Sequence, residues 1–250
     1  MRISIITVCF NAERTIESTI KSVLEQDYDN IEYILIDGYS TDNTMKIVNE
    51  YRNHIDFILS EKDNGIYDAI NKGIAHASGD IVGLLNADDE FFDKHIISKI
   101  ANVFNNSQVL DSIIGDIVFQ NSKNKTIRRY SSKNWKPSKF AWGFMPPHPS
   151  FYCKRAIFYK YGFYNTSFKI AADFDILIRF LKVNSISFRY VSLVFVKMKL
   201  GGTSTSGVSS LLTINKEIIR ACKLNGIKTN YFRLYSKYFI KIFEFFTLRN

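Results

Sequence analysis

The chain has 250 residues, of which 46% are hydrophobic and 15% aromatic, so it is not disordered and is long enough for one domain with a substantial core. Its formal net charge of +9 favours an anionic partner such as a nucleic acid, a membrane surface or a phosphorylated substrate. Because no nucleic-acid-binding motif is present, we expect no nucleic-acid partner. No apolar run is long enough to span a bilayer, and the first one is too short for a signal peptide.

The first half alternates between apolar, β-branched runs and amphipathic segments. Since short loops join them, we predict an α/β fold with a Rossmann-like, doubly wound, mostly parallel sheet. Neither a Gly-x-Gly-x-x-Gly motif nor a P-loop follows the first run, which argues against an ordinary dinucleotide site. The predicted strands are Ile3–Cys9, Ile31–Ile36, Phe57–Leu59 and Ile81–Leu85, and the predicted helices are Thr15–Gln26, Asp42–Val48 and Gly65–Ala77.

The second half is less regular and ends in helices. Trp135–Pro149 contains all four prolines and both tryptophans and is predicted to be an ordered loop. Gly201–Gly207 is either a mobile lid over the substrate or an ordinary connector. The other predicted elements are strands at Ile113–Gln120, Thr126–Tyr130 and Ser150–Cys153, a helix at Phe174–Leu181, a strand or hairpin at Ile186–Lys199, and helices at Ser209–Leu224 and Tyr231–Leu248.

The three cysteines, Cys9, Cys153 and Cys222, lie far apart in the sequence. Their spacing matches no metal-binding or redox motif. We therefore expect a reduced protein in the cytoplasm.

Three polar side chains, Asn86, Asp88 and Asp89, follow the apolar run that ends at Leu85. Ligands of open α/β sheets bind beyond the carboxyl ends of the strands. A carboxylate pair there can hold a hard divalent cation, Mn²⁺ or Mg²⁺, that is shared with substrate phosphates. The alternative is structural, with Asp88 or Asp89 capping a helix that starts near Phe91.

The order of these motifs resembles family 2 glycosyltransferases with the GT-A fold. The matching segments are Ile5–Asn11, Ile34–Thr44, Asp63–Gly73, Leu85–Asp89 and Asp173–Leu177. The segment around Asp63 is similar to enzymes that build bacterial surface polysaccharides such as O-antigen. The resemblance implies a GT-A fold and inverting, hexosyltransferase-type transfer from a nucleotide sugar, with UDP as the expected nucleotide.

The resemblance also implies a donor-binding set. Asp37 would accept the ring N–H of uracil, with Thr7 and Phe10 beside the base, although Asp37 also suits a turn and Phe10 a core. Asp63 and Asn64 would lie near the diphosphate, unless they only cap the next helix. The expected donor-binding residues are Thr7, Phe10, Asn11, Asp37, Asp63, Asn64, Asp68, Asn71, Asn86 and Ala87.

In the acidic motif, Asn86 stands where many relatives have Asp, so it can bind a ribose hydroxyl but brings no charge. That leaves Asp88 as the expected metal ligand, with Asp89 as a further candidate. His148 either lines the acceptor pocket, contacts the metal or is a structural hydrogen-bonding group. Trp142 either stacks on a sugar or anchors its loop.

Asp173 is the expected catalytic base, because inverting transfer needs a carboxylate that removes the proton of the acceptor hydroxyl. The base of the family usually follows a Glu, whereas Ala172 precedes it here, and this leaves Asp175 as a rival. Asp173 could also be the N-cap of the helix at Phe174–Leu181, a role compatible with catalysis.

We expect a GT-A catalytic domain at 1–207, with a nucleotide-sugar-binding half (1–110) and an acceptor half (111–207), and a helical segment at 208–250. Arg233, Lys237 and Lys241 have four-residue spacing beside a broad aromatic face. This pattern favours either peripheral binding to the inner face of the membrane or packing against the domain or a second subunit.

The predicted function is metal-dependent transfer of a sugar to a growing glycan acceptor, expected to be lipid-linked. One alternative is a sugar nucleotidyltransferase, which would normally carry a Gly-rich, basic phosphate loop where this chain has 10–13 (Phe-Asn-Ala-Glu). The other is a non-catalytic binding protein of the same fold, against which the acidic residues argue.

Overall fold

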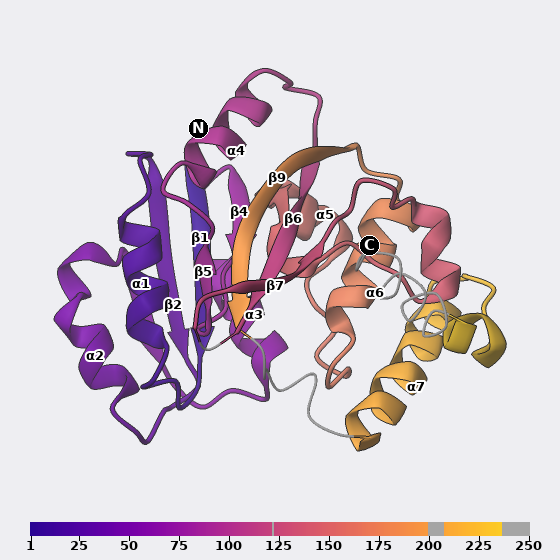
Figure 1. The fold of residues 1–250 in the computed structure, drawn as a ribbon, viewed down its shortest axis with the longest axis horizontal. Helices are drawn as coiled ribbons and strands as arrows, with labels where there is room; N and C mark the ends of the chain where they lie inside the picture. Colours follow the sequence, from indigo (N-terminus) through magenta and orange to yellow (C-terminus); the bar gives the residue numbers. More distant parts are fainter. Residues whose placement is uncertain (122, 200–207, 237–250) are drawn as a thin grey trace.

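The computed structural model of the chain describes residues 1–121, 123–199 and 208–236. Within these residues, nine strands form one sheet with helices on both faces (Figure 1). The strands are β1 (Ile3–Cys9), β2 (Ile31–Asp37), β3 (Phe57–Ser60), β4 (Ile81–Leu84), β5 (Asp89–Phe91), β6 (Ser112–Gln120), β7 (Thr126–Tyr130), β8 (Phe151–Lys154) and β9 (Phe188–Lys199). They lie in the order β3-β2-β1-β4-β8-β6-β9-β5, and β7 pairs with β6.

The first four strands are parallel, so their carboxyl ends form one edge of the sheet. β1 lies between β2 and β4, with Cys9 opposite Asp37, and Asp37 lies opposite Ser60 of β3. Every side chain of β1 is buried, as expected for a parallel strand covered by helices on both faces. The predicted α/β fold class is confirmed, and its parallel, Rossmann-like part lies in this half.

The second half of the sheet is mixed. β8 lies antiparallel to β4 and β6, β9 runs parallel to β6, and the short β5 pairs antiparallel with β9. The sequence pattern does not predict β5, because three residues are too few to show the period of a strand. The next helix, α4 (Ile96–Asn105), begins at Ile96 and not near Phe91, so the expectation of a helix start at Phe91 is wrong.

The helices cover the two faces of the sheet over separate cores. Ile6 and Val8 of β1 are buried in the cluster that contains α3 and α6, whereas Ile3 and Ile5 are buried in the cluster that contains α1 and α4. This alternation follows from the period of two along a strand. The remaining helices are α1 (Ile16–Leu24), α2 (Thr44–Glu50), α3 (Ile66–His76), α5 (Arg155–Tyr161), which the sequence pattern does not predict, α6 (Ala172–Ile178), which continues into a π-helical turn at Arg179–Val183, and α7 (Val208–Leu224).

The described part of the C-terminal segment packs against the rest of the protein. Ile218, Ala221 and Cys222 of α7 and Leu234 are buried in the same cluster as α6. Residues 231–236 are helical, in agreement with the start of the last predicted helix. None of the helices in the described ranges is long and apolar enough to cross a membrane.

Three predicted features fall outside the described residues: the glycine-rich loop 201–207, Lys237 and Lys241. The ordered loop that was expected at 135–149 is present and contains two short 3₁₀ turns, Pro137–Trp142 and His148–Ser150. The three cysteines are free and buried, so their thiols are shielded from solvent.

Candidate active site

Asp37, the last residue of β2, is a buried hydrogen-bonding centre. Its side chain is inaccessible to solvent. Oδ2 accepts the backbone N–H of Ser40 at 3.1 Å and the hydroxyl of Ser60 at 2.6 Å, while Oδ1 accepts the hydroxyl of Ser40. Asp37 therefore joins two strand ends and their loops, and it offers no exposed oxygen to a base. The expected contact between Asp37 and the ring N–H of uracil is not available in this arrangement.

Phe10 and Asp63 lie on either side of Gly38 at the exposed edge of the sheet. Phe10 is 62% exposed, so core packing does not explain it. A Cβ atom on Gly38 would lie 2.5 Å from Asp63 Oδ2 and 3.5 Å from Phe10 Cδ2, and only glycine allows this approach. Asp63 Oδ1 accepts the N–H of Gly65 at 2.8 Å, whereas Oδ2 has no hydrogen bond within the described residues. An aromatic face and a free carboxylate oxygen thus meet at one point.

Two other members of the expected donor set have internal partners. Thr7 is buried within β1 and accepts the hydroxyl of Tyr33 at 3.3 Å, so it cannot lie beside a bound base. Asn11 adopts a left-handed backbone (φ 50°), and its Oδ1 accepts the N–H of Thr41 at 2.9 Å. Asn11 therefore holds the loop after β1 against the loop after β2.

The exposed Asn64 precedes α3, which carries Asp68 and Asn71. Asp68 Oδ2 accepts the N–H of Asn64 at 3.0 Å and lies 3.5 Å from Nζ of Lys72, so it supports the start of the helix. Asn71 exchanges two hydrogen bonds with the backbone of Tyr164, at 2.8 and 2.9 Å. Asn71 therefore joins two segments of the fold and is not free to bind a diphosphate.

The acidic motif lies between β4 and β5. Asp89 is buried and begins β5, opposite Met198 of β9, so neither Asp88 nor Asp89 caps a helix. Asn86 Nδ2 donates to Asp89 Oδ2 at 3.2 Å, while Asp89 Oδ1 has no partner within the described residues. Burial first, and then repulsion from Asp88, raise the pKa of Asp89 well above its usual value. Ala87 is buried.

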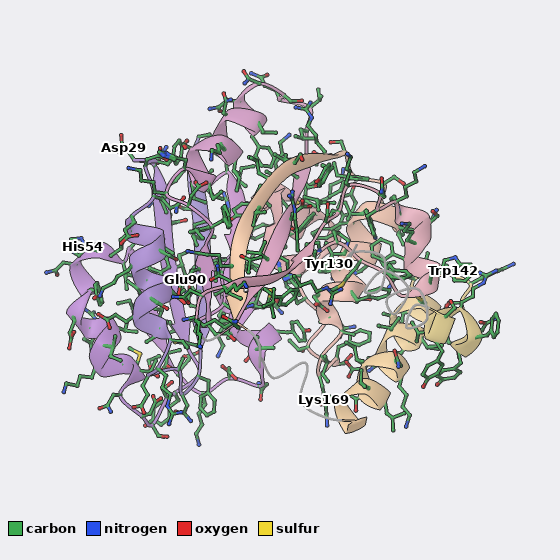
Figure 2. All side chains as sticks on the ribbon, in the orientation of Figure 1. Asp29, His54, Glu90, Tyr130, Trp142 and Lys169 are labelled. Atoms are coloured by element: carbon green, nitrogen blue, oxygen red, sulfur yellow. The ribbon has the colours of Figure 1, made fainter. Side chains whose placement is uncertain are left out.

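The carboxylate of Asp88 is partly exposed and makes no hydrogen bond within the described residues. Glu90, labelled left of centre in Figure 2, is instead paired with two lysines of β9, Lys197 at 3.5 Å and Lys199 at 3.3 Å. No three His, Cys, Asp or Glu side chains converge as metal ligands in the described part of the chain. The donor set therefore fits a cation that takes one or two ligands from the protein and the others from phosphate oxygens and water.

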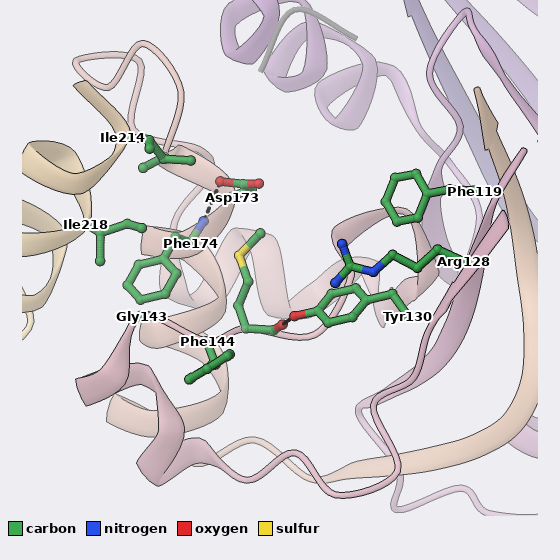
Figure 3. A pocket seen from close by; sticks show the side chains of 11 residues that line it. Phe119, Arg128, Tyr130, Gly143, Phe144, Asp173, Phe174, Ile214 and Ile218 are labelled. Carbon is green, nitrogen blue, oxygen red and sulfur yellow. Dashed lines mark hydrogen bonds between the residues drawn. The ribbon is translucent and has the colours of Figure 1, made fainter. Parts of the chain in front are cut away.

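Asp173 lies in the first turn of α6 and lines a cavity of about 230 Å³ (Figure 3). Burial raises the pKa of its carboxyl to about 7, although the N–H of Phe174, which donates to Oδ1 at 2.7 Å, acts in the opposite direction. A carboxyl group with a pKa near neutrality is suited to accept a proton at physiological pH. The other lining residues are Phe119, Arg128, Tyr130, Gly143, Phe144, Met145, Ala171, Ile214 and Ile218.

Glu217 of α7 holds the start of the helix that carries Asp173. Its carboxylate accepts the backbone N–H groups of Lys169 at 2.8 Å, Ile170 at 2.8 Å and Ala171 at 2.9 Å. Ala171 is the N-cap residue of α6, whose N–H the helix itself leaves unpaired, and Lys169 and Ile170 directly precede it. Ala171 occupies the N-cap position and Asp173 lies in the first turn, so the expected N-cap role of Asp173 is wrong; Glu217, from a distant helix, pairs the backbone donors that lead into α6.

Tyr67 connects the segment at Asp63, where the donor is expected to bind, to α6, the helix that carries Asp173. It lies in the first turn of α3, directly after the Asp63–Gly65 loop, and its hydroxyl donates to the carbonyl of Ile170. The hydroxyl also acts to lower the pKa of Asp173. The expected donor loop and the expected base are therefore held together by one side chain.

Asp175, the rival base, is part of the core. It is buried, accepts Nε of Arg179 at 3.0 Å and accepts Nδ2 of Asn225 at 2.8 Å. Because both oxygens have partners and Asp175 does not line the cavity, the geometry argues against it as a base. Arg179 also donates to the backbone of Tyr161 and Phe163, and so it ties this region together.

His148 and Trp142 do not line the Asp173 cavity. His148 Nε2 lies 2.6 Å from the hydroxyl of Tyr164, and burial lowers the pKa of the imidazole to about 4, so it is neutral. Trp142 lies at the periphery of the molecule (Figure 2), 40% exposed, with the guanidinium of Arg233 5.5 Å from its ring. In this structure His148 is a buried hydrogen-bonding group and Trp142 is a contact of its loop, which are the structural roles considered above.

The family model for Glycosyl transferase family 2 matches residues 4–171 of the chain. The chain belongs to this family. It is 27% identical over 218 residues to the PGL/p-HBAD biosynthesis glycosyltransferase of Mycobacterium bovis, across 81% of this chain and 79% of that protein. This family 2 member is therefore a glycosyltransferase by descent, which disfavours the nucleotidyltransferase alternative.

Solved structures share the GT-A fold of this family 2 glycosyltransferase. TarS 1-349 of S. aureus in complex with UDP-GlcNAc has a TM-score of 0.68 and 17% sequence identity, covering 91% of this chain and 68% of that chain. The mannosyltransferase PcManGT of Pyrobaculum calidifontis, in complex with GDP-Man and Mn²⁺, has a TM-score of 0.62 and 18% identity, covering 88% and 64%. At these identities the likeness establishes the fold.

Sequence reasoning misses three residues of the site in this family 2 glycosyltransferase. Tyr67 lies inside a recognised motif, but its sequence gives no sign of a contact with the segment before Asp173. Arg128 lies on a strand whose exposed pattern indicates only a solvated edge. Glu217 lies 46 residues beyond the last N–H group it binds, and only the packing of α7 on α6 could reveal it.

Proposed function

We propose that this chain is an inverting, metal-dependent glycosyltransferase that moves a sugar from a UDP-sugar to a hydroxyl of a growing, lipid-linked surface glycan. Family membership and the UDP-GlcNAc bound to TarS support the nucleotide-sugar donor. The observation that carries the proposal is Asp173, a carboxyl with a pKa of about 7 that lines a cavity and lies on a helix tied to the donor loop by Tyr67.

In the proposed reaction Asp173 takes the proton of the acceptor hydroxyl as its oxygen attacks the anomeric carbon. A bond forms between this oxygen and the anomeric carbon, and the bond from that carbon to the diphosphate oxygen breaks. Attack opposite the diphosphate in a single displacement inverts the anomeric configuration. The cavity brings Asp173 and the hydroxyl together, and positioning of this kind lowers the barrier of the reaction.

On the donor side, Phe10 provides a flat surface for the base, and Asp63 Oδ2 takes the place we expected Asp37 to have as acceptor of the ring N–H. Asn64, which is exposed, and Asn86, whose amide already donates to Asp89 Oδ2 at 3.2 Å, would contact the ribose or diphosphate. Asp88 would hold Mn²⁺ or Mg²⁺ together with diphosphate oxygens. The charge that develops on the leaving diphosphate would be neutralised by such a cation.

The test is a screen of nucleotide sugars with Mn²⁺, in which release of free nucleoside diphosphate is measured with and without EDTA. We expect release from a UDP-sugar that EDTA abolishes, even when water is the acceptor. Release of pyrophosphate when the protein is given UTP and a sugar 1-phosphate, with the nucleotide sugar as the other product, would contradict the proposal in favour of a nucleotidyltransferase. Donor binding without turnover would favour a binding protein.

A peripheral contact with the inner face of the membrane is part of the proposal, and it concerns residues 231–236. Leu234 is buried in the protein, whereas Phe232 is 82% exposed beside Arg233. An exposed aromatic beside a cation suits an anionic membrane surface. Phe232→Ser should weaken co-sedimentation with anionic vesicles without lowering the Tm, and unchanged co-sedimentation would leave packing as the only role of this segment.

A further inference from the structure

One wall of the Asp173 cavity carries an arginine that has ring contacts but no carboxylate partner. β6 and β7 pair antiparallel with Phe119 opposite Arg128, and Tyr130 lies two residues further along the same face of β7. The guanidinium carbon of Arg128 lies 5.9 Å from the centre of the Phe119 ring and 5.8 Å from that of Tyr130. Within the described residues Arg128 makes no ion pair, so its charge is not neutralised.

The next residue, Arg129, shows the opposite arrangement. Its side chain lies on the other face of β7, where it forms an ion pair of 2.6 Å with Asp116, whose carboxylate is fully buried. Tyr190 also donates to that carboxylate at 3.1 Å. In this hairpin the charge of Arg129 is therefore neutralised by Asp116, whereas Arg128 lies at the cavity between the rings of Phe119 and Tyr130. Contacts with aromatic rings hold a guanidinium in place without using its N–H donors.

The facing wall is apolar. Phe174 of α6 and Ile214 and Ile218 of α7 lie beside Asp173 on one side of the cavity, and Arg128 lies on the other side (Figure 3). The hydroxyl of Tyr130 donates to the carbonyl of Met145 at 2.7 Å and so already has a partner. Among the residues that the structure describes, the charged groups that line the cavity are therefore one proton acceptor and one unpaired cation on opposite walls.

We propose that the cavity binds an amphiphilic acceptor, with an apolar group against Phe174, Ile214 and Ile218 and an anionic phosphate or carboxylate on Arg128. This inference rests on the proposed function, because Asp173 must meet the reacting hydroxyl between the two walls. A ring with many hydroxyl groups would leave most of them without partners on the apolar wall, which is unfavourable. The planar guanidinium matches the two oxygens of a phosphate or carboxylate.

The size of the cavity limits what it encloses. Its volume of about 230 Å³ is below the roughly 300–1,000 Å³ of typical small-molecule sites. It therefore takes only the part of the acceptor next to the reacting hydroxyl, and the rest extends outside. Short amphiphiles are the appropriate probes.

The experiment measures binding of four probes by isothermal titration calorimetry at pH 6, where Asp173 is mostly protonated. Hexyl phosphate combines both features, hexyl β-glucoside has the apolar chain without charge, glucose 1-phosphate has the charge without the chain, and hexanoate separates carboxylate from phosphate. We expect hexyl phosphate or hexanoate to bind at least tenfold more tightly than the other two probes. Whichever of the two binds more tightly identifies the anionic group.

The variant Arg128→Gln should remove the preference for anionic amphiphiles, so that hexyl phosphate and hexanoate bind about as weakly as hexyl β-glucoside. Lys133→Gln is the matched control, because it removes one exposed charge close in sequence without touching the cavity, and it should bind like the unaltered protein. Ile218→Asn, checked for folding by its Tm, should weaken hexyl phosphate and hexyl β-glucoside alike. Equal binding of hexyl phosphate by the unaltered protein and Arg128→Gln would overturn the inference, as would glucose 1-phosphate that binds as tightly as hexyl phosphate.

The metal-dependent donor hydrolysis of the unaltered protein separates this inference from the proposed function, since it needs no acceptor. If donor turnover occurs and the amphiphiles do not bind selectively, only the acceptor class is wrong. If the amphiphiles bind selectively and no donor is turned over, the function is wrong and the binding site stands.

Discussion

Glu217 accepts the backbone N–H of Ala171 at 2.9 Å, and this contact joins a helix near the end of the described chain to the start of the helix that carries Asp173. The same carboxylate accepts two further N–H groups of this segment. Such charge-assisted hydrogen bonds are stronger than neutral ones. Glu217 is therefore a positioning residue for the expected base, and its negative charge also raises the pKa of Asp173.

Replacing Asp173 by Asn should abolish transfer and leave donor binding intact. The amide cannot accept the proton of the acceptor, and positioned general bases contribute about 10²- to 10⁴-fold to rate. kcat measured with a glycan acceptor should therefore fall by this amount, while the Kd for UDP is unchanged. Asp175→Asn is the comparison: it breaks the ion pair with Arg179 and should lower the Tm. Transfer at full rate by the Asp173 variant would remove this residue from the mechanism.

The pH dependence of kcat/KM should show an acidic limb near the pKa of Asp173, about 7, with activity rising as the carboxyl loses its proton. Glu217→Gln should move this limb to lower pH, because the variant removes a negative charge that raises the pKa of Asp173, while its amide oxygen can still accept N–H groups. Glu50→Gln, at the exposed end of α2, should leave the limb where it is. A role for Glu217 limited to stability would lower the Tm without moving the limb.

The stability of the protein should depend on pH through the same group. The pKa of Asp173 is about 7 in the folded protein and 3.8 as its reference value, so the folded state holds this proton more tightly. The resulting stability is complete below about pH 4 and is lost as the pH rises through 7, at a cost of about 4 kcal/mol for a shift of this size. The advantage of Asp173→Asn over the unaltered protein in free energy of unfolding should therefore grow between pH 4 and pH 8. Urea unfolding at the two values measures this growth, and a constant difference would contradict the raised pKa.

Phe10→Ala and Gly38→Ala should each weaken UDP binding. The first removes the exposed ring, and base–aromatic stacking contributes about 1–3 kcal/mol per base. The second puts a Cβ 2.5 Å from Asp63 Oδ2 and so displaces the proposed acceptor of the ring N–H. Calorimetry with UDP measures both effects. Tyr159→Ala is the control, because Tyr159 is also more than half exposed but lies on α5. A loss of affinity in the control, or none with Phe10→Ala, would exclude the proposed base site.

The parallel half of the fold can be predicted from the sequence because each buried strand is a continuous apolar run. β1 has the bounds that its pattern predicts, Ile3–Cys9. β5 cannot be predicted in this way, since its residues become a strand only by pairing with Val196–Met198, more than a hundred positions later. The local sequence pattern thus specifies the strands that fill the core, whereas a short strand at the edge of the sheet, such as β5, is specified by pairing with a segment distant in the sequence.

The site follows the same division. The sequence places Phe10, Asp63, Asp88 and Asp173 at element ends, and the structure leaves each of them at least partly accessible. The sequence cannot show which carboxylates are buried. The carboxylate of Asp37, for example, accepts hydrogen bonds from the hydroxyl groups of Ser40 and Ser60. Motif position therefore identifies candidates, while the hydrogen-bond partners decide which of them remain free.

α7 contributes both to the wall of the cavity, through Ile214 and Ile218, and to the start of α6, through Glu217. Chimeric proteins that exchange C-terminal helices between relatives in order to change the acceptor would therefore alter selectivity and the alignment of the base together. An exchange that keeps the glutamate at position 217 and varies only the isoleucine positions should separate the two properties.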